Sequence, residues 1–189
     1  MTAPLTADTT VIGAGAVDLW VRSSTPDVDL QATISEVRPD GNETFVQNGW
    51  LRASERALSR GAANILGIPS TPTDPVPSFK AADAAPMPAG KFVKLVIPLY
   101  DEGHVYRVGS RIRVTISAPN GTQPVWSFSQ TVPTGTATVS IARSASMASS
   151  LVLPVLAGVT APTPLPPCPS LRNEPCRPYQ PMVNTGGTP

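Results

Sequence analysis

The stretch that most constrains the fold of this chain is the heptapeptide RIRVTIS near its middle. Polar and apolar residues alternate strictly along it, and the apolar ones are β-branched: Ile112, Val114 and Ile116. A period of two places the two sets of side chains on opposite faces of a β-strand. The sequence therefore predicts a strand with one face in a core and a polar face that carries Arg111 and Arg113.

Comparable patterns recur along the chain and are separated by turn residues. They cover residues 17–22, 30–37, 44–52, 93–99, 125–128, 137–141 and 150–155. Within the second of these, Glu36 stands where the next apolar side chain is due, which predicts a bulge or a twist. About eight strands at this spacing predict an all-β fold, and a β-sandwich in particular.

Two segments depart from the strand pattern. Ser54–Arg60 predicts one or two helical turns with Ser54 as the N-cap. Residues 61–90 are rich in proline and glycine and lack periodicity. A connection of about 30 residues is long for a compact domain, so we expect it either to be functional or to lie against a neighbouring surface.

Charge and hydropathy exclude several classes of function. Charged residues make up 14% of the chain, and the net charge is +1. This balance gives no electrostatic argument for binding nucleic acid or an anionic membrane. No run approaches the ~20 apolar residues of a membrane-spanning helix. The N-terminus lacks the features of a signal peptide, and we expect the chain to be a piece of a longer protein.

Composition divides the chain near residue 158. We expect residues 1–158 to form the β-domain and residues 159–189 to be an extended, proline-rich tail. The tail holds both cysteines, Cys168 and Cys176, too far apart for a CxxC motif and without the further ligands of a zinc site. A local disulfide is favoured over two free thiols, and it would indicate an oxidising compartment.

The sequence offers little for catalysis. His104 is the only histidine, and no GxSxG elbow is present. A triad would have to use His104 with Asp101 or Glu102, but no serine has the surroundings of an activated nucleophile. We therefore expect His104 to be a loop residue that hydrogen-bonds the backbone, and the chain to hold no catalytic residue. Without a complete glycine-rich nucleotide loop, we also expect no cofactor.

Two sets of side chains leave a binding function open. Three acids near turns could gather a calcium ion, although turn-forming roles are more common for such residues: Asp27, Asp29 and Asp40. Three tryptophans could form a platform for a sugar, or else fill the core or an interdomain seam: Trp20, Trp50 and Trp126. Of these alternatives, the turns and the core or seam are favoured.

Several segments together resemble one family, the CocE/NonD hydrolases, which include cocaine esterase and the X-Pro dipeptidyl-peptidases. VDLWVRSSTPDVDLQATISEVRPDGNETFVQNGWLRAS is similar to the opening of their C-terminal domain. PLYDEGHVYRVGSRIRVTISAPNGTQPVW resembles its H-V-[FY]-x-x-G-x-R-[IL]-R segment, and SSLVLPV resembles its closing strand. The tail PPCPSLRNEPCRPY is similar to an extension in exported actinobacterial members. The resemblance runs from about Thr6 through Tyr179.

The resemblance implies a jelly-roll β-sandwich of the galactose-binding-like class. In this family the Ser–Asp–His triad lies on an α/β-hydrolase domain that precedes the jelly roll, so no catalytic residue carries over to this chain. His104 matches a histidine of the jelly-roll segment, not that of the triad. The resemblance also implies packing against an α/β-hydrolase domain, in the same parent chain or in a separate subunit, and a part in walling its substrate cleft. It further implies contacts within a homo-oligomer and an extracellular or cell-envelope location.

These implications give the polar strand a role as a docking strand. Arg111 and Arg113 would pair with acids such as Asp18 or Glu36, or with the α/β-hydrolase domain. The residues expected at an interdomain contact are His104, Arg111, Arg113, Trp50 and Trp126. The alternative function is a free-standing module that binds carbohydrate or another protein, because sandwich folds host many functions.

Overall fold

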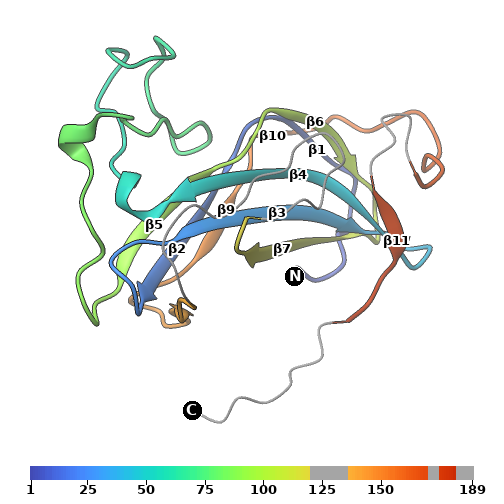
Figure 1. The fold of residues 1–189 in the computed structure, drawn as a ribbon. Coiled ribbons are helices and arrows are strands. Elements are labelled where there is room, and N and C mark those ends of the chain that lie inside the picture. The colour runs from blue at the N-terminus through green and yellow to red at the C-terminus, as the bar shows by residue number, and fades with distance from the viewer. Residues whose placement is uncertain (120–135, 170–174, 182–189) are drawn as a thin grey trace.

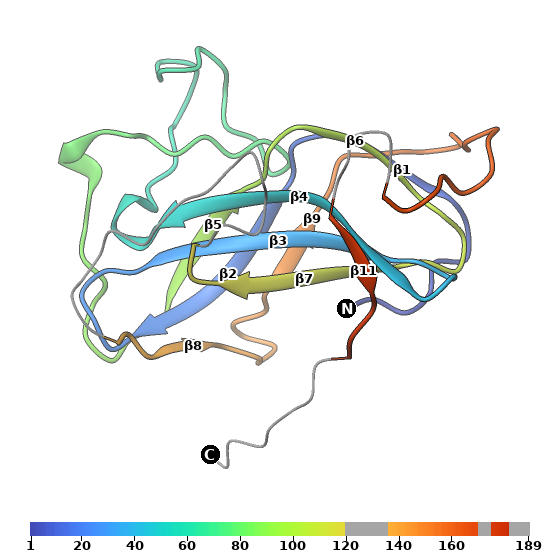
Figure 2. The same cartoon turned by 45° about the vertical axis from the view of Figure 1, so that its right-hand side comes forward.

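The computed structural model describes residues 1–119, 136–169 and 175–181. Within these residues the chain forms eleven β-strands, two short 3-10 helices and no α-helix. The strands make three antiparallel sheets (Figures 1 and 2). The all-β class predicted from the alternating patterns is confirmed. The predicted strand at residues 125–128, with Trp126, lies outside the described residues.

The first sheet has the strand order β10-β1-β6, with β1 at Thr9–Gly13, β6 at Glu102–Tyr106 and β10 at Val155–Leu156. The second has the order β11-β4-β3-β7, with β3 at Asp29–Val37, β4 at Asn42–Arg52, β7 at Arg111–Ser117 and β11 at Cys176–Pro178. The third has the order β5-β2-β8, with β2 at Ala16–Ser23, β5 at Val93–Pro98 and β8 at Val139–Ile141. Strand β9, at Ser150–Val152, also pairs with β2, and the 3-10 helices are η1 (Ala53–Glu55) and η2 (Ala81–Asp83).

The hydrophobic core lies between the β11-β4-β3-β7 sheet and the sheet behind it. In both views β3, β4 and β7 cross in front of β2 and β9 (Figures 1 and 2). Alternate residues of β2, β3 and β5 are at most 4% exposed there: Val17, Leu19, Val21, Leu30, Ala32, Ile34, Leu95 and Ile97. Burying each of the larger aliphatic side chains stabilises the fold by roughly 1.5–3 kcal/mol. The alternation seen in the sequence therefore identifies which faces of β2, β3 and β5 are buried in the core.

The irregularity predicted near Glu36 is a β-bulge, and its extra residue belongs to the neighbouring strand. Ile34 pairs with Gln47, whereas the next residue of β3 pairs with Phe45, so Val46 is left over in β4. Val46 packs into the core at 2% exposure. Glu36 stays on the core face of β3, where it is also 2% exposed.

Two local predictions are wrong. The helix expected over Ser54–Arg60 is only the 3-10 turn η1, because the backbone of Ala57 and Ser59 hydrogen-bonds residues 76–78 instead of continuing a helix. The stretch around His104, expected as a turn, is strand β6, which pairs with β1 along its whole length. Gly103 and His104 interrupt the apolar alternation that would have marked this strand.

Residues 53–92 form the β4–β5 connection, which stands outside the sheets at the end of the molecule away from β11 (Figures 1 and 2). Its two arms meet in a narrow neck, where Ser59 N donates to Val76 O and Ser78 N donates to Ala57 O, both at 2.8 Å. Val76 is 1% exposed, so the neck packs against the domain. The connection therefore has a fixed base and a projecting tip.

Candidate functional site

The histidine singled out in the sequence forms a buried pair with an acid. His104 lies on β6 and Glu36 on β3, so the pair joins two different sheets. His104 Nε2 donates to Glu36 Oε2 at 2.9 Å, and the two side chains are 20% and 3% exposed. His104 is thus held by a side chain, whereas the sequence predicted a loop histidine that hydrogen-bonds the backbone.

Further groups from the end of β6 surround the Glu36 carboxylate. Burial favours the neutral acid, but the hydrogen bond from His104, its charge and the backbone N–H of Arg107 (3.2 Å) lower the pKa of Glu36 below its ordinary value. The neighbouring Tyr106 is fully buried, and its burial, with the charge of Glu36 close by, raises the pKa of its hydroxyl. The cluster therefore keeps an ionised carboxylate inside the domain.

This cluster is not a catalytic site by the geometry of the described residues. A histidine base needs a nucleophile within about 2.6–3.2 Å in addition to an orienting acid. Glu36 supplies the acid, but no described serine, threonine or cysteine hydrogen-bonds the His104 ring. The pair therefore resembles the supporting half of a triad and functions here as a tie between sheets.

Arg113 forms a second buried cluster on the opposite face of the β11-β4-β3-β7 sheet. Its Nη1 donates to the Glu43 carboxylate at 3.0 and 3.3 Å, and Ser35 Oγ donates to the same carboxylate at 2.6 Å. Arg113 is 9% and Glu43 5% exposed. The acid partner is thus Glu43 and not the predicted Asp18 or Glu36. Asp18 pairs with Lys94 at 2.7 Å instead.

The C-terminal tail covers this second cluster. Strand β11 pairs with the edge of β4, and Arg177 Nη2 lies 3.3 Å from the Glu43 carboxylate. Arg113 also donates to the carbonyl of Gln180 (3.4 Å) and lies over the Tyr179 ring, 5.7 Å from its centroid. The polar face of β7 is therefore occupied at Arg113 by residues of this same chain.

Two arginines of the domain hold the preceding part of the tail. Arg107 donates to the carbonyls of Ala161 and Pro164, and Arg38 donates to that of Pro166 at 2.8 Å. A disulfide joins Cys168 to Cys176. It closes a loop within the tail immediately before β11 pairs with β4. The tail thus lies along the domain surface in the described residues.

The other predicted contact residues lie on two sides of the β11-β4-β3-β7 sheet. Arg111 is half-buried on β7, and its side chain donates to the carbonyl of Thr2 (3.2 Å). Trp50 packs edge-on against Tyr100 with ring centroids 5.5 Å apart, and its indole N–H donates to Gln31 at 2.9 Å. His104 lies on the core side of the β11-β4-β3-β7 sheet, and Arg113 lies on its outer side. Trp126 lies outside the described residues. Among the described residues, the register therefore places Trp50, Arg111 and Arg113 on the outer face of this sheet and separates them from His104.

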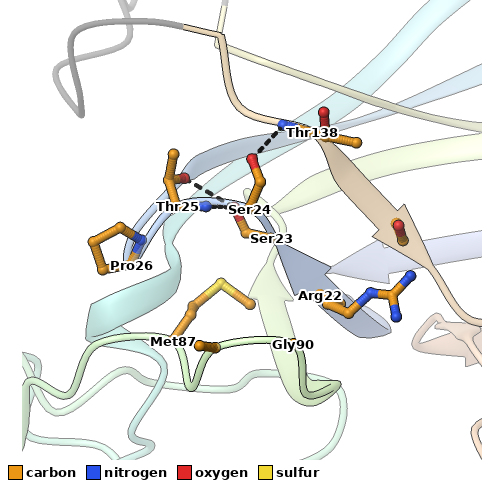
Figure 3. A pocket seen from close by; sticks show the side chains of 10 residues that line it. Arg22, Ser23, Ser24, Thr25, Pro26, Met87, Gly90 and Thr138 are labelled. Carbon is orange, nitrogen blue, oxygen red and sulfur yellow. Dashed lines mark hydrogen bonds between the residues drawn. The ribbon is translucent and has the colours of Figure 1, made fainter.

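A cavity of about 440 Å³ opens beside the end of β2 (Figure 3). Ser23 and Thr25 line it, and their hydroxyls are 2.9 Å apart. Ser24 Oγ accepts the backbone N–H of Thr138 at 2.9 Å, while Met87 lies across from these residues. The hydroxyls shape the turn after β2, and the described lining offers no histidine or carboxylate for catalysis.

The acids considered for calcium are engaged elsewhere. Asp27 caps backbone N–H groups, Asp29 pairs with Arg52 at 2.9 Å, and Asp40 pairs with Arg38 at 2.7 Å. Among the described residues, no cluster of three or more histidine, cysteine or carboxylate side chains could hold a metal ion. The same residues contain no helix with the length and apolar character to cross a membrane.

Sequence reasoning missed an exposed apolar surface on the β4–β5 connection. Five large side chains along this connection are 37–80% exposed: Leu58, Ile65, Leu66, Ile68 and Phe79. The sequence signal was present in the length of the connection, which indicated a functional or docked segment. Without periodicity, however, the pattern could not tell which of its apolar residues would be buried.

Comparison with known proteins places this arrangement in a family. The family of the X-Pro dipeptidyl-peptidase C-terminal non-catalytic domain matches residues 1–150. Two mycobacterial proteins provisionally named serine esterases, from Mycobacterium bovis and Mycobacterium tuberculosis, are 29% identical over 154 residues. Those residues are 82% of this chain, which spans only 23% of each relative.

Two solved structures share the fold. A CocE/NonD family hydrolase from Staphylococcus aureus has a TM-score of 0.65 and 21% identity over 81% of this chain and 29% of its own. An α-amino acid ester hydrolase has a TM-score of 0.58 and 19% identity over 82% of this chain and 25% of its own. The match over residues 1–150, which is most of the chain, shows that the chain belongs to the family of the X-Pro dipeptidyl-peptidase C-terminal non-catalytic domain.

Proposed function

We propose that this chain serves a serine hydrolase by packing on its α/β-hydrolase domain and helping to wall the substrate cleft. The observation that carries the proposal is the incomplete catalytic set. The one histidine of the chain is bound to Glu36 between two sheets and lacks a nucleophile among the described residues. A domain of this kind contributes shape and contacts, and the reaction takes place on its partner.

The proposal includes the finer features expected from the sequence. The three sheets would belong to a jelly roll of the galactose-binding-like class. The disulfide between Cys168 and Cys176 supports an oxidising location, so the parent protein would be exported, as in actinobacterial members with a similar tail. Its substrates would be acyl esters or X-Pro peptides, and the domain would also be available for contacts within a homo-oligomer.

Activity assays on the chain alone and on its parent protein test this proposal. We expect no turnover of short-chain nitrophenyl esters or of Gly-Pro-nitroanilide by the chain alone. The coding sequence upstream should encode, in frame, an α/β-hydrolase domain with a GxSxG elbow, and the complete protein should turn over one of these substrates. Turnover by the chain alone that a serine-directed reagent abolishes would contradict the proposal.

A free-standing carbohydrate-binding module is the second candidate, and one groove favours it. A cavity of about 290 Å³ lies between the β11-β4-β3-β7 sheet and the tail, lined by hydroxyls of Thr33 and Thr115, the Phe45 ring and the Arg177 side chain. Hydroxyls beside an aromatic ring suit a sugar. Calorimetric titration with mono- and oligosaccharides would show saturable heat if this candidate is correct and none if the groove only seats the tail.

A further inference from the structure

The apolar tip of the β4–β5 connection is held in a defined shape although it is exposed. Ile65 is 80% and Leu66 60% exposed. Between the arms, the Asn64 amide donates to the carbonyls of Gly61 (2.8 Å) and Ile68 (2.6 Å) and accepts the backbone N–H of Leu66 (2.9 Å). A surface that is already ordered loses less conformational freedom on binding. The tip is therefore pre-organised for contact.

At the base of the connection, an aromatic side chain is exposed from an unfavourable backbone conformation. Phe79 has a φ of +51° and is 61% exposed. Its neighbour Ser78 is anchored at the neck through the bond to Ala57. A positive φ costs a residue with a bulky side chain free energy, and such outliers persist where function uses them. Nothing in the packing of the described residues requires a phenyl ring at this position.

Charged residues lie beside one of these apolar side chains, Leu58. Arg60, Lys80 and Asp83 line a hollow of about 830 Å³ that also includes Leu58. An apolar centre with a charged rim is the usual arrangement of a protein–protein interface. The five apolar side chains named above, Leu58, Ile65, Leu66, Ile68 and Phe79, are called the connection patch below.

We infer that the connection patch is the surface on which this domain docks to the α/β-hydrolase domain of its parent protein, an inference that rests on the proposed function. The partner follows from chain length, because more than three quarters of the mycobacterial relatives lies outside the region that this chain matches. A neighbouring domain of that size is the body available to cover the patch.

Two other places considered for docking, Arg113 and the edge of β4, are covered by this chain itself. Arg113 contacts Glu43, Tyr179 and Gln180 of this same chain, and β11 pairs with the edge of β4. The connection patch lies at the opposite end of the molecule from β11 (Figure 1). Docking through the connection would leave the contacts between the tail and the sheet in place.

The test uses the parent protein with a specific protease site inserted between its two domains. After cleavage, the affinity of the two halves is measured by sedimentation and by surface-based binding. The substitution Ile65→Asp should weaken binding at least tenfold, because it puts a charge at the centre of the interface. Ile12→Asp is the matched control: Ile12 is 58% exposed on β1 and should leave the affinity within twofold.

Phe79→Gly adds a readout that a purely structural residue would not give. Glycine accepts a positive φ without a steric cost, so the melting temperature of the isolated chain should rise, while the affinity for the hydrolase domain should fall. Melting curves of all variants also show that each one folds.

Each result decides a different claim. Loss of affinity in Ile65→Asp and Phe79→Gly, with the control unchanged, supports the inference. Tight binding that survives both substitutions overturns the inference and leaves the proposed function standing. Wild-type halves that separate on cleavage, or a parent protein without a hydrolase domain, overturn the proposed function and the inference with it.

Discussion

Two buried glutamates on neighbouring strands show how differently one sheet uses the same side chain. Glu36 points from β3 into the core and binds His104 of another sheet. Glu43 points from β4 to the outer face and binds Arg113 of its own sheet and Arg177 of the tail. The first holds two sheets together, whereas the second holds the tail onto a sheet.

The two clusters also differ in the parts of the chain that they join. Both partners of the Glu36 pair lie within residues 1–150, the region that matches the family. The Glu43 cluster reaches past it to Arg177, Tyr179 and Gln180. The Glu36 tie therefore lies wholly within the matched region, whereas the Glu43 cluster joins that region to the tail.

The largest effect should follow the loss of Glu36. Glu36→Ala leaves His104 and the backbone N–H of Arg107 without their acceptor in the interior, which should cost about 3 kcal/mol of unfolding free energy. Chemical denaturation of the isolated chain measures the loss. Asp18→Ala is the control, because Asp18 pairs with Lys94, whose side chain is 49% exposed, and this pair should be worth less than about 1 kcal/mol. Equal losses of unfolding free energy in the two variants would show that the Glu36–His104 pair does not hold the two sheets together.

Arg113→Ala should have the next largest effect. Among the described residues, the substitution leaves the buried Glu43 with Ser35 and the exposed Arg177 as donors, so we expect a loss of about 2 kcal/mol. Faster amide exchange at Arg177 and Tyr179 should accompany it, because their backbone pairs with β4 and the turn before it. Arg111→Ala, on the same face of the same strand, removes one bond to a backbone carbonyl and should cost less than about 1 kcal/mol. An unchanged tail in Arg113→Ala would break the proposed link between this cluster and the tail.

The contrast between the clusters also explains what the sequence could predict. Alternation along β2, β3, β5 and β7 identified the core faces, because side-chain direction in a strand follows directly from residue order. The partner of Arg113 could not be found in this way, since register across a sheet decides it. The bulge at Val46 changes that register in β4, between Glu43 and Trp50.

Strands with weak patterns and the tail were harder to predict. Strand β6 carries Gly103 and His104 in place of an apolar alternation, and β11 is a three-residue strand that includes a proline. Both are strands because a partner edge is available, at β1 and at β4. The clusters at Glu36 and Glu43 likewise depend on contacts between segments 68 and 70 residues apart. Local sequence carries no signal at that distance.

Acid should weaken the Glu36 tie selectively. Because the pKa of Glu36 is lowered in the folded chain, its ionised form stabilises the fold at neutral pH. This contribution is lost as the pH falls below the ordinary value of 4.5 towards the lowered one. The stability difference between the wild type and Glu36→Gln should therefore shrink with decreasing pH. Because Asp8 and Asp40 also have lowered pKa values and are present in both proteins, the difference is the quantity to measure. A constant difference between pH 7 and pH 3 would contradict this account.

The smallest effect on stability should come from Arg177, although it joins the same acid as Arg113. Its side chain is 65% exposed, so solvent screens the pair with Glu43, and Arg177→Ala should cost less than about 1 kcal/mol. Its effect on amide exchange in the tail should be larger, because the pair between Arg177 and Glu43 is the described ion pair that joins β11 to the sheet. We expect amide exchange to rise at Arg177 and Tyr179 while the amides of β3 stay protected. Arg177→Lys should restore part of the protection, because it keeps the charge. If amide exchange in β3 rises equally, then the tail unfolds together with the sheets. That result would contradict the separate roles given to Glu36 and Glu43.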